Sequence, residues 1–79
     1  EDNLVREMLK AAFFIFHLFH EKNWNAVFKT LDVEIVFIID SVLGAMLDFC
    51  ELYDIPYAKR IILTILKFVL HYSMANYKL

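Results

Sequence analysis

VEIVFIIDSVLGAMLDFCELY, residues 33–53, is the stretch that decides the fold. Drawn as a helix, it carries one narrow line of polar and small side chains: Glu34, Ser41, Gly44, Asp48 and Glu51, with Asp40 beside them. Nearly every other direction around this helix is apolar. A helix that is apolar on most sides must be surrounded by other helices. A chain of 79 residues has too few helices to do this, so the sequence predicts that a partner covers part of this one.

Apolar residues are unusually abundant for so short a chain. Hydrophobic residues make up 61% of the sequence, although a small domain has a large surface relative to its volume and buries less of its chain. The length fits a single all-helical domain, residues 1–79. The apolar excess indicates an oligomer, a fragment of a larger protein, or membrane contact. Of these, we expect a homo-oligomer, most simply a dimer, or docking of a helix from another protein.

Charge and cysteine content disfavour several other classes of protein. A membrane span needs about 20 mostly apolar residues, and charges such as Asp40, Asp48 and Lys67 interrupt every long apolar segment. The net charge of −2 disfavours nucleic acid, because binding phosphates needs a dense basic face. The single cysteine, Cys50, cannot form an intramolecular disulfide. We expect it to be a small buried residue and the protein to be cytoplasmic, in a reducing compartment.

Helical periodicity runs through the whole chain, which has one Gly and one Pro. It predicts an all-α fold, a small bundle of four helices over about 2–22, 24–31 (one short helix), 33–53 and 56–77. Asp32 is a suitable N-cap for the third helix. Pro56 suits the first position of the fourth helix, because its fixed φ angle is helical and its missing N–H has no partner there.

Opposite charges predict that the third and fourth helices form an antiparallel hairpin, completed by oligomerisation. Residues 31–54 contain six acids and no Lys or Arg, whereas residues 55–79 contain four Lys or Arg and no acid. Three pairs come level when the chain folds back at Ile55: Glu51 with Arg60, Asp40 with His71, and Glu34 with Lys78. Exposed pairs contribute only about 0–1 kcal/mol, so they specify register. Chance segregation, or a kinked continuous helix through Pro56, are the alternatives.

No pattern in the sequence supports catalysis or a resident cofactor. His17 and His20 are a weak metal pattern, because the fold would have to supply the remaining ligands. Asp40 and Asp48 lie on or beside the polar line, where solvated charges are the simpler interpretation. The chain has no phosphate-binding loop, nucleophile elbow or zinc-binding helix. We expect no catalytic residues, no cofactor-binding residues and no metal ligands, and we expect that the protein is not an enzyme.

One local pattern resembles the LisH dimerisation motif, a helix-turn-helix that pairs into a four-helix unit. The residues that carry the resemblance are Ile15, Leu18, Phe19, Asn23, Trp24, Val27, Phe28, Leu31 and Glu34. Asn23 stands where that family usually has Gly, and Trp24 stands where it has Tyr or Phe. The resemblance covers residues 15–34 and implies self-association.

These observations predict a non-enzymatic interaction module or scaffold that homodimerises, or docks a partner helix, through an exposed apolar surface. Phe14 and Phe37 interrupt otherwise polar lines, and exposed aromatic side chains often mark contacts. Ser41 and Gly44 are small enough to let another helix approach. The predicted interface residues are Phe13, Phe14, Phe16, Phe37, Ser41, Gly44 and Phe68. The alternative is a small helical bundle that binds an apolar ligand, a lipid or a cofactor, against its Phe-rich first helix.

Overall fold

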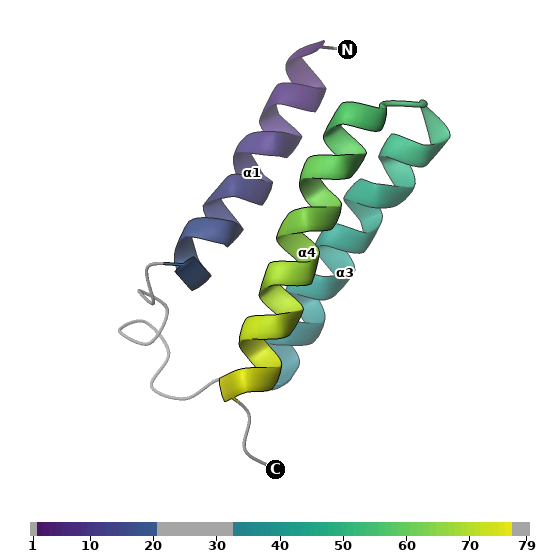
Figure 1. Ribbon diagram of the computed structural model, residues 1–79. Helices are drawn as coiled ribbons and strands as arrows, with labels where there is room; N and C mark the ends of the chain where they lie inside the picture. Colours follow the sequence, from purple (N-terminus) through teal and green to yellow (C-terminus); the bar gives the residue numbers. More distant parts are fainter. Residues whose placement is uncertain (1, 21–32, 77–79) are drawn as a thin grey trace.

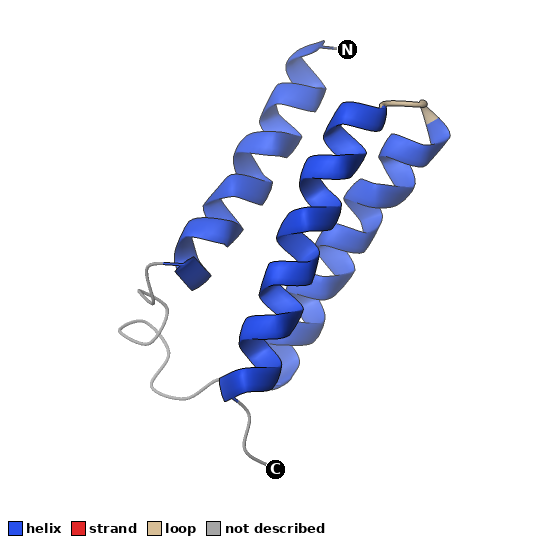
Figure 2. Ribbon diagram, in the orientation of Figure 1, coloured by secondary structure: helices blue, strands red, loops and turns tan. Residues whose placement is uncertain are grey.

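A computed structural model of the protein describes residues 2–20 and 33–76. These residues form three helices and no strand: α1 (Asp2–His20), α3 (Val33–Leu52) and α4 (Pro56–Asn76) (Figures 1 and 2). The all-α prediction is confirmed. The structure has three helices where the sequence predicted four, because the short helix predicted over residues 24–31 lies outside the described residues.

The last helix in the chain, α4, is the central one. Both α1 and α3 pack along α4, whereas α1 and α3 contact each other far less. Figure 1 shows α1 and α4 running in the same direction, and α3 running in the opposite direction beside α4. Among the three described helices, none covers the side of the bundle between α1 and α3.

The core is a single strip of buried side chains on each helix. Its members recur every seven residues, or at alternating spacings of four and three: Val5, Ala12 and Phe19 from α1, Leu43 and Cys50 from α3, and Ala58, Ile62, Ile65 and Val69 from α4. This spacing keeps side chains on one side of a helix, as in coiled coils. Because α4 supplies four of these nine buried residues and the other helices pack against it, the core lies along α4.

Cys50 is buried within this core, with 1% of its surface exposed, as the sequence predicted. Burial raises the pKa of its thiol, and the positive charge of Lys59 opposes that shift more weakly. The thiol is therefore neutral at physiological pH and acts as a small apolar side chain.

The chain turns between α3 and α4 through a compact cap. The Ile55 N–H donates to the Cys50 carbonyl at 2.9 Å, and the Asp54 N–H donates to the Glu51 carbonyl at 3.4 Å. Asp54 has a φ of 55°, the left-handed conformation. These are the features of a Schellman motif, which satisfies carbonyls that the end of a helix leaves free. The Ile55 carbonyl then accepts from the Lys59 N–H at 3.0 Å, so Pro56 is the first residue of α4, as predicted.

An ion pair joins α3 and α4 near this turn, one residue away from the predicted position. Lys59, not Arg60, bonds Glu51, at 2.7 Å. Successive residues of a helix point about 100° apart, so Lys59 lies on the side of α4 that reaches Glu51 and Arg60 does not. The same bond raises the pKa of Lys59.

The other two predicted pairings were Asp40 with His71 and Glu34 with Lys78. Within the described part of the chain, no ion pair joins Asp40 to His71. Lys78 lies outside the described residues, so its pairing with Glu34 stays a prediction.

Replacing Asp54 with Gly should raise the free energy of unfolding by about 0.5–1 kcal/mol. Glycine adopts the left-handed conformation without steric cost, and the change also removes an acid from the negative end of α3. Asp54→Asn is the control, because it removes the charge but keeps a side chain that tolerates this conformation. Urea denaturation measures both variants. A lower stability for Asp54→Gly than for the unaltered protein would contradict the assigned cap.

Candidate interaction surface

Large apolar side chains are numerous on the outside of the described helices. Eleven of them are exposed: Leu4, Phe13, Phe14, Phe37, Ile38, Val42, Leu52, Tyr53, Tyr57, Leu63 and Leu70. A single exposed apolar residue is ordinary, but a contiguous group marks a contact surface. Three of the eleven, Leu4, Phe13 and Val42, line grooves between the described helices.

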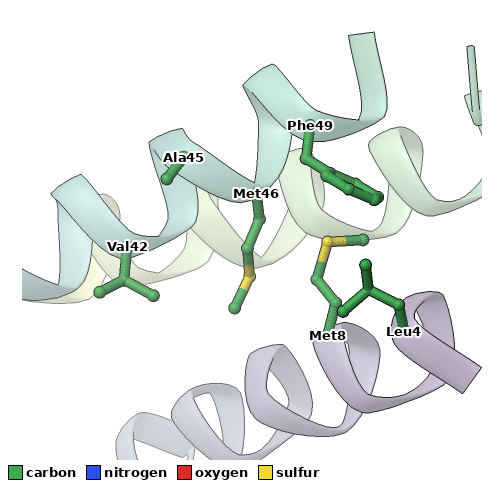
Figure 3. Close-up of a pocket in the computed structure, with 6 residues that line it drawn as sticks. All are labelled: Leu4, Met8, Val42, Ala45, Met46 and Phe49. Carbon is green, nitrogen blue, oxygen red and sulfur yellow. The ribbon is translucent and has the colours of Figure 1, made fainter. Parts of the chain in front are cut away.

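A groove lies between α1 and α3, on the side that α4 does not cover. Its volume is about 340 Å³ and it opens to solvent. The lining side chains are Leu4 and Met8 from α1, and Val42, Ala45, Met46 and Phe49 from α3. In Figure 3, Met46 and Phe49 project from α3 toward Met8 and Leu4. The groove exists because both helices pack against α4 rather than against each other.

The chemistry of this groove is uniformly apolar. None of its six lining side chains can donate or accept a strong hydrogen bond. A polar ligand would lose its hydrogen bonds with water there and gain none in return. The two methionines, Met8 and Met46, have flexible side chains that adapt to different apolar shapes. The groove therefore suits aliphatic or aromatic side chains.

A second groove lies between α1 and α4. Its volume is about 290 Å³, and its lining residues are Phe13, Phe16, Ile61, Thr64 and Ile65. The Thr64 hydroxyl donates to the Arg60 carbonyl of the same helix at 2.9 Å, so it already has a partner. This groove is also apolar, although it contains one polar side chain.

The seven predicted interface residues lie at different places in the structure. Phe13, Phe14 and Phe37 are exposed, with 43%, 58% and 65% of their surface accessible. Ser41 is also exposed, and Gly44 is partly buried. The structure does not bring the seven together into one groove: only Phe13 and Phe16 line the groove between α1 and α4, and none lines the groove between α1 and α3.

Phe16 and Phe68 belong to the contact between α1 and α4. Their ring centroids are 5.0 Å apart, and both side chains are partly buried against the core. The Phe16 ring also stacks on His20, at 5.2 Å. Their assignment to an intermolecular interface stays a prediction, and in the single chain both side chains already have an intramolecular role.

Sequence reasoning missed the six residues that line the groove between α1 and α3. A signal for the α3 side was present, because Val42, Ala45, Met46 and Phe49 recur at helical spacing on one face. The apolar arc of α3 is wider than a single neighbouring helix covers. Which part of that arc stays open depends on where α1 packs, and the sequence does not state this.

The ionisable side chains of the described residues lie mostly apart from one another on the surface. His17 and His20 are both exposed on α1. Across residues 2–20 and 33–76, no three His, Cys, Asp or Glu side chains come close enough together to hold a metal ion. The recorded ion pairs, Lys59 with Glu51 and Lys10 with Glu7 at 3.3 Å, are solvent-exposed. Exposed pairs of this kind contribute little to stability.

Among the helices that the structure describes, none is both long enough and apolar enough to cross a membrane.

The chain matches no protein-family model, no curated protein and no solved structure. The resemblance to the LisH motif therefore depends on the quoted residues alone, most of which lie outside the described part of the chain.

Replacing Gly44 with Ala should raise the free energy of unfolding by about 1 kcal/mol. Alanine is preferred over glycine in a helix interior by about that amount, and a Cβ added at Gly44 meets no described atom within 4 Å. Thermal and urea denaturation measure the change. A destabilised variant would show that the space beside Gly44 is occupied, and weaker self-association would place a partner helix there, as the sequence predicted.

Proposed function

We propose that this protein is a non-enzymatic interaction module that forms a homodimer through its exposed apolar helical surface. In this proposal α1 and the antiparallel hairpin of α3 and α4 make an incomplete bundle, and a second copy completes it. The buried, free thiol of Cys50 fits a reducing compartment such as the cytoplasm.

The observation that carries the proposal is the open apolar groove between α1 and α3. Six apolar side chains line it, and further exposed apolar residues, including Ile38 and Leu52, lie on α3. Leaving this much apolar surface in water costs free energy, at roughly 25 cal/mol for each Å² that a partner could cover. Association removes that cost for both copies at once.

The alternative function, binding of a small apolar ligand, is supported by the same lining but less well by the shape. Ligand sites enclose most of the ligand and usually have volumes of about 300–1,000 Å³. The groove is at the lower end of that range and is open to solvent. It also lacks the few polar groups that normally orient a ligand. Native mass spectrometry separates the two functions, since a carrier shows a co-purified adduct.

Sedimentation equilibrium at several micromolar concentrations tests the proposal. We expect a mass that rises with concentration from about 9.4 kDa toward twice that value. Val42→Glu should shift the equilibrium strongly toward monomer, because a carboxylate in an apolar interface lacks a partner. Val42 is 41% exposed in the single chain, so the fold should survive the change.

The matched control is Lys67→Gln. It makes the net charge more negative by one, as Val42→Glu does, but it lies on the exposed face of α4 and should leave association unchanged. Circular dichroism checks that both variants keep their helical content. A monodisperse monomer for the unaltered protein at every concentration would refute the proposed function.

A further inference from the structure

We propose that two copies pair through α3, antiparallel, with the two-fold axis at Ala45. The inference rests on the proposed function, dimerisation, and names the helix and register that carry it. It starts from a second strip of apolar residues on α3, on a different side from the buried strip of Leu43 and Cys50. This outer seam consists of Ile38, Val42, Ala45, Phe49 and Leu52.

The outer seam has the spacing of a coiled-coil contact. Its residues are separated by four, three, four and three positions, which is the alternation that places side chains along one line facing a neighbouring helix. Ile38 and Leu52 are 61% and 75% exposed. Ala45 is exposed and Phe49 is partly buried. The outer seam thus extends over about four helical turns and has the pattern of a helix-pairing surface. The other described helices leave most of it exposed to solvent.

The segment that joins α1 to α3, residues 21–32, is too short to cover the whole of the outer seam. Residues 21–32 connect the end of α1 to the start of α3, and both of these helix ends lie away from the turn between α3 and α4 (Figure 1). Leu52 lies about 28 Å along α3 from Val33, at 1.5 Å per residue. Twelve residues that go out and return reach at most about 20 Å, even fully extended. They therefore cannot cover the outer seam as far as Phe49 and Leu52, which the second copy covers in this proposal.

The outer seam is self-complementary about Ala45. Ile38 lies seven residues before Ala45, and Leu52 lies seven residues after it. Val42 lies three residues before Ala45, and Phe49 lies four residues after it. In an antiparallel pair centred on Ala45, Ile38 therefore meets Leu52 of the second copy, and Val42 meets its Phe49. Two alanines at the crossing point allow a close approach of the backbones, and a large ring faces a smaller side chain. A two-fold dimer needs this kind of self-complementary patch.

A polar pair beside the outer seam favours the antiparallel arrangement over the parallel one. Ser41 and Asp48 lie seven residues apart on the same edge of the seam, and both are exposed. In the antiparallel register Asp48 comes beside Ser41 of the second copy, whose hydroxyl can donate to the carboxylate. In a parallel pair the two copies of this edge lie on opposite sides of the contact, so Asp48 does not come beside Ser41 of the second copy.

Of the residues that the sequence predicted for the interface, Ser41 is the one that adjoins the outer seam. Gly44 belongs to the polar line of α3 and Phe37 interrupts that line, so both lie farther from the outer seam than Ser41 does. Leu4, exposed at the mouth of the groove between α1 and α3, lies near the seam residues that line that groove. The second copy therefore also shields part of α1.

Opposite charges introduced at Ala45 test the register. Ala45→Glu and Ala45→Lys should each weaken dimerisation by at least about 100-fold, since two like charges meet at the axis with no partner. An equimolar mixture of the two variants should dimerise again, because Glu meets Lys. This rescue requires residue 45 of one copy to lie beside residue 45 of the other. Sedimentation measures all three samples, and circular dichroism checks that each variant folds.

The matched control is the same pair of charges at Thr64, which lines the groove between α1 and α4 and is exposed. Thr64→Glu and Thr64→Lys should each dimerise like the unaltered protein. If the Thr64 variants lose association and the Ala45 variants keep it, the outer seam is not the interface, although dimerisation stands. If the Ala45 variants separate but their mixture does not recover, the register is wrong. A monomeric unaltered protein would overturn this inference and the proposed function together.

Discussion

The packing of two helices against one strip of α4 is the constraint on which the rest of this structure depends. Ala58, Ile62, Ile65 and Val69 form that strip, and α1 and α3 both bury their own strips against it. The small side chain of Ala58 lets neighbouring helices come close to the α4 backbone. Because both helices pack against α4, neither buries its second apolar side against the other. The open groove between α1 and α3 is a consequence of packing both helices around α4.

The core that results is small. Nine described residues are buried, and two of them, Ala12 and Ala58, contribute little apolar area. Small domains bury a smaller fraction of their surface than large ones, and their stability is correspondingly low. The exposed apolar residues of α3 are surface that a single copy leaves in contact with solvent. In the proposed dimer, association and folding stability are linked, because covering the outer seam stabilises the folded state by mass action.

The turn between α3 and α4 positions this surface. The left-handed Asp54 and the start of α4 at Pro56 reverse the chain within three residues, 53–55. The ion pair of Glu51 with Lys59 lies beside the same turn. A short, capped connection leaves little freedom in how α3 rotates relative to α4. That rotation decides which strip of α3 is buried and which faces outward.

The sequence by itself determined the features that depend on neighbouring residues. The helical class, the break before Pro56 and the burial of Cys50 follow from periodicity, backbone restriction and local composition, and the structure bears them out. The apolar excess was also visible, together with the inference that something must cover it.

Only the tertiary structure decided where the uncovered surface lies. A helical pattern gives the relative directions of side chains but not the rotation of each helix about its own axis. A shift of one residue exchanges Arg60 for Lys59 as the partner of Glu51. The same rotation places Phe16 and Phe68 inside the contact between α1 and α4. It also leaves Val42, Ala45 and Phe49 at an open groove, because α1 and α3 bury their sides against α4 and not against each other.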